Sequence, residues 1–397
     1  MNPVEVKKDI YWVGAVDWNI RDFHGYTTYK GTTYNAYLAL DEKVVLFDTV
    51  KQGFESQLLH RIQRLTQPEK IDYLVVNHVE PDHSGSFVQM VERIKPDKIF
   101  CSPMGHKALL QHYHRPDWPY EEVRSGDSIS LGRNSVHFLE TRMLHWPDSM
   151  FSFLPEEKLL ISSDAFGHHW ATSQRFDDQV DLAELMAHAA KYYANILLLY
   201  SPLVQKLLAK VKDMGLEIET IAPDHGLIWR QNAGRIIAAY DTWSRQETKA
   251  KATIAYDSMW HSTETMARAI LEPLASQGIE VKLMDLKVSH RSDVVTELLD
   301  SKAFLTGSPT LNNGMMPLMA DLLHYVRGLK PAGRLGAAFG SYGWSGEAVK
   351  LMNQALEDMK INLVHPGLRV QYVPDHDQLQ ECTHLGLEMA EAIKAGA

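Results

Sequence analysis

The sequence predicts an α/β protein of two domains, of which the second is a doubly wound parallel sheet. The chain has 397 residues, which is enough for two domains of ordinary size. In the first part, short apolar runs end in polar loops, and in the second, strand-like and helix-like stretches alternate regularly. That alternation is typical of a parallel sheet whose strands are connected by helices. We therefore expect one domain at residues 1–248 and another at residues 249–397.

Composition excludes several classes of protein. Hydrophobic residues make up 45% of the chain and charged residues 23%, which excludes global disorder. The net charge of −10 argues against nucleic acid or an anionic membrane as a partner, because both need a basic face. No apolar run approaches the ~20 residues of a membrane helix, and 2 cysteines are too few for a disulfide framework or a cysteine-ligated iron–sulfur centre. The chain is expected to be cytoplasmic.

In the first domain, each predicted strand leads into a loop that carries a His or an Asp. The predicted strands are residues 44–47, 73–76, 159–161 and 218–221. The loops that follow them contain Asp48, His78, Asp164 and His225. A helix is expected over residues 181–193, where apolar residues recur near the 3.6-residue period. Loops at strand ends are where such folds place their chemistry.

The second domain follows a polar segment, residues 246–251, which we interpret as the linker. Its predicted strands are residues 253–256, 281–286, 303–306 and 335–339, and its predicted helices are residues 263–277, 317–326 and 346–359. Helices in these positions act as crossovers between parallel strands.

The loop after the second predicted strand has the spacing of a metal site. It reads NHVEPDHSG (residues 77–85) and contains His78, Glu80, Asp82 and His83. In extended backbone, alternate residues point to the same side, so the first three can face one cavity while His83 turns in after the proline. Each histidine taken alone is as readily explained as a helix cap or as the partner of a buried carbonyl. The whole set favours a metal centre, because loops that bury several charges usually hold a metal.

Three further candidate ligands, His145, Asp164 and His225, follow later strands. Together with the first loop they give seven candidates, whereas a tetrahedral zinc ion takes about four. The number therefore favours two metal ions with one carboxylate bridging them. The candidates are rich in carboxylates and include no thiolate, which shifts the preference toward iron or manganese, although imidazole also serves zinc, copper and nickel.

These motifs resemble those of a known family. The spacing His-x-Glu-x-Asp-His at residues 78–83 is similar to the metallo-β-lactamase fold, whose dizinc hydrolases carry His-x-His-x-Asp-His. Here Glu80 stands at the second His position. That change, with the segments HWPDSM (145–150) and SSDAFG (162–167), resembles the flavodiiron proteins, also called A-type flavoproteins. The resemblance implies a metallo-β-lactamase-like αββα first domain with a non-haem diiron site.

The resemblance also implies how the two iron ions are held. By position, the ligands would be, for one iron, His78, Glu80 and His145; for the other, Asp82 and His225; and, as the bridge, Asp164. Members of the family differ in whether the residue at the position of His83 coordinates iron or turns away, so both alternatives stay open.

Three loops in the second domain resemble the FMN site of flavodoxin. They follow the first, third and fourth predicted strands, at the carboxyl ends where doubly wound sheets bind ligands. The residues expected to contact FMN are Ser258, Met259, Trp260, His261, Ser262, Thr263, Ser308, Pro309, Thr310, Asn312, Asn313, Ser341, Tyr342, Gly343, Trp344 and Gly346. Hydroxyls and N–H groups at a helix N-terminus can hold a phosphate without a basic residue. A simple helix cap is the alternative for Ser262 or Thr263.

A protein with these two sites is expected to be an oxidoreductase. Two ferrous ions and one reduced FMN hold enough electrons to reduce O2 to water or NO to N2O, and the metal can supply Lewis acidity while the flavin supplies re-reduction. The resemblance implies the same activity, used for scavenging in an anaerobe. It also implies that His24 and Tyr193 line the substrate pocket, with helix-core packing as the alternative for Tyr193. Trp146 is expected to shape the cavity wall.

Two other functions fit part of the sequence: a dizinc hydrolase fused to a flavodoxin domain, and a redox or NO sensor without turnover. Hydrolysis needs no flavin, and Glu80 replaces a His that zinc favours. The chain has no cysteine tetrad, so an external electron donor, rubredoxin or reduced deazaflavin, is expected. A head-to-tail homodimer, or a dimer of such dimers, would set the flavin of one subunit against the metals of the other.

Overall fold

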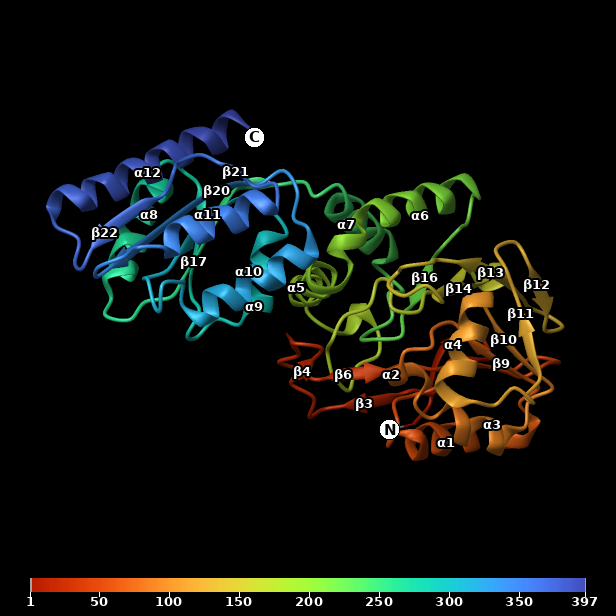
Figure 1. The fold of residues 1–397 in the computed structure, drawn as a ribbon. Coiled ribbons are helices and arrows are strands. Elements are labelled where there is room, and N and C mark those ends of the chain that lie inside the picture. Colours follow the sequence, from red (N-terminus) through yellow and green to blue (C-terminus); the bar gives the residue numbers. More distant parts are fainter. Residues whose placement is uncertain (1, 397) are drawn as a thin grey trace. The chain divides into compact units, whose positions relative to one another are not determined.

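The structure is a computed structural model that describes residues 2–396, which form two compact units (Figure 1). The first unit comprises residues 2–23, 28–192 and 202–241, and the second comprises residues 24–27, 193–201 and 242–396. Each unit has its own sheet structure and its own apolar core. Whether residues 1–248 and 249–397 fold as independent domains stays a prediction.

The first unit is built on two sheets. The larger has the strand order β1-β2-β7-β8-β9-β10-β11, and the smaller has the order β12-β13-β14-β15-β16. The larger sheet comprises β1 (Val4–Lys7), β2 (Ile10–Trp12), β7 (Tyr37–Ala39), β8 (Val45–Phe47), β9 (Tyr73–Val76), β10 (Lys98–Cys101) and β11 (Tyr120–Glu122). The smaller comprises β12 (Ser128–Ser130), β13 (Ser135–Glu140), β14 (Met150–Leu154), β15 (Leu159–Ile161) and β16 (Thr220–Ala222). The short strands outside them are β3 (Ala15–Asp17), β4 (Asp22–Phe23) and β6 (Thr32–Tyr34), whereas β5 (Tyr26–Thr27) belongs to the second unit.

The two sheets pack face to face, and helices cover the larger sheet from outside. Phe47 of β8 and Phe138 of β13 belong to one buried apolar cluster between the sheets. Leu46 belongs to a second cluster, together with Leu58 and Ile62 of the helix that follows β8. Neighbouring residues of a strand face opposite sides, so the apolar run 45–47 is buried on both faces. This is why the run reads as continuously hydrophobic rather than alternating.

Helices connect the parallel strands of this unit and cover its outer faces. They are α1 (Glu55–Gln63), α2 (Pro81–Ser84), α3 (Phe87–Ile94), α4 (Pro103–Tyr113), α5 (Leu182–Tyr192), α6 (Ser201–Asp213) and α7 (Ala233–Ser244). Beyond the smaller sheet, the ring of Phe151 lies 6.4 Å from that of Phe166, which in turn lies 4.4 Å from Tyr240 of α7. Helix, sheet, sheet and helix layers follow one another, as the sequence predicts.

The second unit is a parallel sheet with the strand order β18-β17-β19-β20, and β21 and β22 both pair with β20. Its strands are β17 (Lys249–Tyr256), β18 (Glu280–Asp285), β19 (Ser301–Gly307), β20 (Leu335–Tyr342), β21 (Asn362–Leu363) and β22 (Leu368–Gln371). Its helices are α8 (Ser262–Ser276), α9 (Arg291–Leu298), α10 (Pro317–Leu329), α11 (Ala348–Asp358) and α12 (His376–Ala395). This is the doubly wound sheet predicted from the alternation. Among residues 2–396, no helix is both long enough and apolar enough to span a membrane.

The linker interpretation of residues 246–251 is wrong in its second half. Residues 249–251 are the first residues of β17, where Lys251 forms ion pairs of 2.6 Å with Glu297 and 2.7 Å with Asp300. The segment is polar because its lysines face a carboxylate pair, so polarity here does not indicate a disordered connection.

The helix expected over residues 181–193 ends one residue early. It ends at Tyr192, and the chain continues as a π-helical turn, Tyr193–Leu197. Within the second unit, Asn195 in this turn donates to the carbonyl of Ser292 (3.1 Å) and accepts from the hydroxyl of Tyr325 (2.9 Å). These side-chain contacts hold the turn, and the 3.6-residue pattern gave no sign of them.

We expect Gly340→Ala to destabilise the second unit. A methyl group at Gly340 in β20 would lie 1.9 Å from the carbonyl oxygen of Ser308, so the backbone has to move. Overpacking of this kind costs about 1–3 kcal/mol of unfolding free energy. Because Ser308 begins one of the loops predicted to contact FMN, bound flavin should fall as well. Urea unfolding and flavin content measure the two effects.

Gly328→Ala is the matched control for that substitution. Gly328 lies in α10, and nothing lies within 4 Å of its added methyl group. Alanine is favoured over glycine in a helix by ~1 kcal/mol, so this variant should be slightly more stable than the parent. Equal stability of the two variants would contradict the steric argument.

Candidate metal centre and flavin pocket

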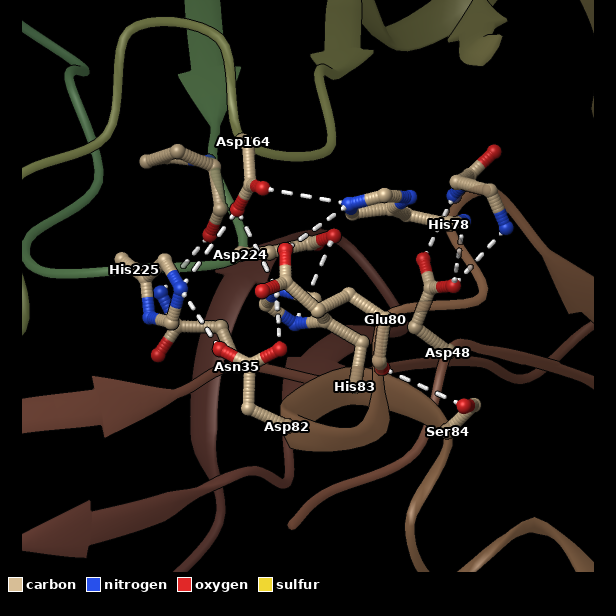
Figure 2. Close-up of polar contacts among 12 residues, drawn as sticks. Asn35, Asp48, His78, Glu80, Asp82, His83, Ser84, Asp164, Asp224 and His225 are labelled. Carbon is tan, nitrogen blue, oxygen red and sulfur yellow. Dashed lines mark hydrogen bonds and ion pairs between the residues drawn. The ribbon is translucent and has the colours of Figure 1, made fainter. Parts of the chain in front are cut away.

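The predicted metal ligands lie together in the first unit, at the ends of its strands, and Figure 2 labels all of them except His145. The loop after β9 and the α2 helix supply His78, Glu80, Asp82 and His83, and the segments after β13, β15 and β16 supply His145, Asp164 and His225. All except His145 are buried, and the side chain of His145 is 14% exposed. The structure therefore brings all seven predicted ligands close to one another, although their role as ligands stays a prediction.

The first group of ligand atoms surrounds one carboxylate oxygen of Asp164. Its Oδ2 atom lies 2.8 Å from Nε2 of His145 and 3.4 Å from Nε2 of His78. The same two nitrogens lie 3.0 Å and 3.3 Å from Oε2 of Glu80. Two imidazoles and two carboxylates thus converge on one point.

The second group surrounds the other oxygen of the same carboxylate. Oδ1 of Asp164 lies 3.1 Å from Nε2 of His83 and 3.4 Å from Nε2 of His225. These nitrogens lie 3.4 Å and 3.0 Å from the two oxygens of Asp82. Asp164 therefore reaches one group with each of its oxygens, which is the arrangement of a bridging ligand.

The donors fit a pair of metal ions. Within residues 2–396, no hydrogen bond reaches either carboxylate oxygen of Asp82 or Oδ1 of Asp164. Burying a carboxylate without a donor or a cation is costly, and metal ions supply the missing positive charge. Imidazole and carboxylate ligands without a thiolate suit iron or manganese.

Two histidines are held so that their Nε2 atoms face the metal centre. Nδ1 of His78 donates to Oδ2 of Asp148 (2.9 Å), and Nδ1 of His225 donates to the carbonyl oxygen of Thr33 (2.7 Å). Because Nδ1 carries the proton, Nε2 presents a lone pair, as a metal ligand must.

Protons compete with metal ions for this centre. Burial lowers the pKa of His145, but its hydrogen bonds to Asp164 and Glu80 outweigh burial and raise the pKa to about 9. Burial raises the pKa of Asp164, but His83 and His145 outweigh it and hold that pKa well below its usual range. In the absence of metal, the carboxylates therefore keep protons on the histidines.

A cavity of about 620 Å³ in the second unit lies at the carboxyl ends of β17, β19, β20 and β22. Of the residues predicted to contact FMN, those that line it are Met259, Trp260, Ser262, Pro309, Thr310, Asn312, Asn313, Ser341, Tyr342, Gly343 and Trp344. Ser345, Tyr372 and Val373 line it as well and were not predicted. The remaining predicted residues, Ser258, His261, Thr263, Ser308 and Gly346, are absent from the described lining.

The cavity fits an aromatic ligand with a phosphate. None of its described lining residues is charged, and Trp260, Tyr342 and Trp344 offer rings for stacking. The α8 helix begins at Ser262 on the cavity wall, and a helix N-terminus attracts phosphate. The hydroxyl of Ser262, on the same wall, can bind a phosphate oxygen.

Two family models match the chain: "ODP family beta lactamase" over residues 32–226 and "Flavodoxin" over residues 254–386. A nitric oxide reductase of Moorella thermoacetica is 50% identical over 394 residues, which are 98% of this chain and 99% of that one. The solved flavodiiron protein of Giardia intestinalis is 35% identical, with a TM-score of 0.97, and the match covers 100% of this chain and 98% of that one. The chain belongs to the flavodiiron protein family. The solved rubredoxin:oxygen oxidoreductase of Desulfovibrio gigas is 43% identical, with a TM-score of 0.98, and the match covers 100% of this chain and 99% of that one.

Membership of the flavodiiron family confirms the predicted fold class. The metallo-β-lactamase-like αββα domain followed by a flavodoxin-like sheet matches both the family models and the solved flavodiiron structures. The oxidoreductase class is confirmed as well. The individual site residues stay predictions, which the geometry supports to different degrees.

Sequence reasoning missed several residues of this flavodiiron protein. Asp148 lies inside the HWPDSM segment but was given no role, and Asp224 was passed over although its Oδ2 lies 3.8 Å from Nδ1 of His83. Tyr372 was missed because no strand was predicted near it, although β22 runs parallel to β20 and ends at the same sheet edge. The signal for Asp148 was its place in the motif, two residues after Trp146.

Trp146 lies at the metal centre, whereas His24 and Tyr193 belong to the second unit. The ring of Trp146 lies 5.3 Å from that of His78 at the metal centre. His24 and Tyr193 belong to the second unit, where the hydroxyl of Tyr193 lies 3.0 Å from that of Ser201. The role of His24 and Tyr193 in lining a substrate pocket stays a prediction.

The iron-free protein is expected to lose stability as pH rises from about 6.5 to 9. The folded pKa of His145 is about 9, whereas an unfolded histidine titrates near ~6.5. A raised pKa means that the folded state holds the proton more tightly, so the contribution is complete below pH ~6.5 and lost above pH ~9. Its size is on the order of 1–3 kcal/mol. Urea unfolding of chelator-treated protein across this range measures it.

The control for this prediction is His145→Gln, which removes the titrating ring. The variant should show a shallower pH dependence between pH ~6.5 and ~9 than the parent. Iron-loaded protein should also depend less on pH there, because the metal replaces the proton. A pH-independent stability of the iron-free parent would contradict the prediction.

Proposed function

We propose that this chain is a flavodiiron oxidoreductase that reduces O2 to water or NO to N2O at a non-haem diiron site, with electrons relayed through FMN. The observation that carries the proposal is the carboxylate of Asp164, shared between two groups of imidazole and carboxylate donors. A chain that combines such a centre with a flavodoxin domain has both a redox metal site and its source of electrons. Relatives named nitric oxide reductase and rubredoxin-oxygen oxidoreductase match over nearly their full length.

The proposed ligands of one iron are His78, Glu80 and His145, and Asp164 bridges to the other. For the second iron we propose Asp82, His83 and His225. The coordination of His83 was left open by the sequence. It is supported here by the position of its Nε2 atom, 3.1 Å from Asp164 and 3.4 Å from Asp82.

The residues around the metal centre hold the ligand side chains in the orientation that metal binding needs. When bound, the two irons supply electrons and open positions for a diatomic substrate, and reduced FMN restores those electrons. Asp148 and the carbonyl of Thr33 hold the histidine rings with their Nε2 atoms inward. The ring of Trp146 packs edge-on against that of His78. Reduction of O2 consumes four protons and that of two NO consumes two, so the substrate also needs a supply of protons.

Of the two alternative functions, the dizinc hydrolase lacks this support. A dizinc hydrolase makes no use of a flavin pocket, and Glu80 lies at the ligand position where such hydrolases carry a histidine. A sensor without turnover would share every contact described above, so only steady-state consumption of O2 or NO distinguishes it from the enzyme.

We also propose an external electron donor and a head-to-tail dimer. The Desulfovibrio gigas relative is named for rubredoxin, and a one-electron donor of that kind, or a reduced deazaflavin, would reduce the FMN. Trp260 and Trp344 on the cavity rim are 87% and 89% exposed. Such exposed aromatic rings support a partner surface beside the flavin, and a second copy of this chain would place its diiron site there.

Reduced protein is expected to be re-oxidised rapidly by O2, by NO or by both. Protein from iron-replete cells should contain two irons per chain, and anaerobic stopped-flow mixing of the fully reduced protein with each gas measures the rates. The matched variant Glu80→His restores the ligand pattern of dizinc hydrolases and should shift the metal content toward zinc, with loss of re-oxidation at the metal. Parent protein that binds zinc but no iron, or that shows no turnover with either gas, would contradict the proposal.

A mixing experiment tests the head-to-tail dimer. His145→Ala should lack the iron site, and Trp260→Ala with Ser262→Ala should lack flavin, so each homodimer should be inactive. After subunit exchange, a mixed dimer has one intact flavin facing one intact metal site, and about half of the parent activity per mixed dimer should return, because one of its two site pairs works. If each subunit works alone, mixing restores nothing.

A further inference from the structure

Asp148 accepts a hydrogen bond from one histidine of the first metal position, His78, and lies in the same loop as the other, His145. Its Oδ2 atom accepts hydrogen bonds from Nδ1 of His78 (2.9 Å) and from the backbone N–H of Val79 (2.7 Å). Its own carbonyl accepts from the hydroxyl of Ser102 (2.7 Å) at the start of α4. Asp148 is 3% exposed, so water does not compete for these bonds. His145 precedes it by three residues in the same loop.

This arrangement restricts His78 in two ways. One carboxylate oxygen holds both the imidazole ring and the next peptide N–H, so the ring cannot turn without breaking a bond to the same atom. The proton on Nδ1 leaves Nε2 free to bind metal, and a carboxylate acceptor raises the basicity of the ring.

Among residues 2–396, the second metal position has no equivalent contact. Nδ1 of His225 donates to the neutral carbonyl of Thr33, and Asp224 lies 3.8 Å from Nδ1 of His83, beyond hydrogen-bond distance. Both positions have two histidines and one carboxylate besides Asp164. The difference between them therefore lies in what supports the histidines, and one carboxylate supports the first position.

We propose that Asp148 is a positioning residue that fixes the orientation and tautomer of His78, and that it sets the metal affinity of the first position independently of the second. The proposal rests on the diiron centre of the proposed function. It assigns Asp148 no contact with substrate: the residue acts through His78 and through the loop that carries His145.

Cobalt titration of the metal-free full-length chain tests this without any redox chemistry. Co²⁺ gives visible absorption that reports each binding step. The parent should bind two ions. In Asp148→Ala one of the two sites should weaken by about 10–100-fold and its absorption bands should shift, while the other keeps its affinity, as expected for loss of a partner behind a ligating histidine.

Two further variants separate positioning from folding. Asp148→Asn keeps an acceptor for His78 and Val79, as the Thr33 carbonyl does for His225, so its affinity should lie between those of the parent and Asp148→Ala. Asp177→Asn is the matched control, because Asp177 is also buried and accepts from the backbone of Arg230 and Asn232 without contacting a proposed ligand. Its cobalt titration should match the parent.

The outcomes distinguish this inference from the proposed function. A parent chain that fails to bind two ions would overturn the diiron centre itself. A parent that binds two ions, with Asp148→Ala unchanged at both sites, would overturn only the role of Asp148. Equal weakening of both sites, or weakening in Asp177→Asn as well, would show a general loss of structure and would also overturn the positioning role.

Discussion

The burial of negative charge at the strand ends of the two sheets is the constraint on which the first unit depends. In the part of the chain that the structure describes, Asp82 and Asp164 form ion pairs only with histidines. No lysine or arginine neutralises them there, so without metal their counter-charges are the protons that they keep on the histidines. Metal ions resolve this, but only if every ligand is held in place before binding. The strands, loops and supporting polar residues of this unit serve that requirement.

Supporting side chains, more than regular secondary structure, hold the ligand loops. Asp48, labelled in Figure 2, lies at the end of β8 and accepts from the backbone N–H (2.8 Å) and the side-chain amide (2.7 Å) of Asn77, which precedes the first ligand. Asn35 donates to the carbonyl of Pro223 (2.7 Å) and so holds the loop that carries His225. Burial raises the pKa of Asp48 to about 6, with His83 and Asn77 acting against it. The loops therefore have fixed positions although they contain few ladder hydrogen bonds.

The sequence predicted what depends on local pattern and missed what depends on distant contacts. The ligands at residues 78–83 are readable because extended backbone places alternate side chains on one side, and Asp164 because a buried strand ends just before it. Asp148 could not be assigned, since its partner His78 is 70 residues away. Tyr372 was missed because β22 alternates buried and exposed residues over four positions only. A run that short is no clear strand signal without the neighbouring β20.

The metal centre of this flavodiiron protein is built from charged side chains, whereas the described lining of the flavin cavity has none. The two sites should therefore respond differently to pH and to chelators. The metal centre consists of titratable side chains in mutual contact, so protons and chelators compete directly for its occupancy. The described walls of the flavin cavity contain no charged side chain, and the groups predicted to hold its phosphate, the N-terminus of α8 and hydroxyls, do not titrate near neutral pH. Flavin occupancy should therefore persist under acid or chelating conditions that remove the metal. It follows that loss of turnover with the flavin retained indicates a defect at the metal centre rather than a failure of the fold.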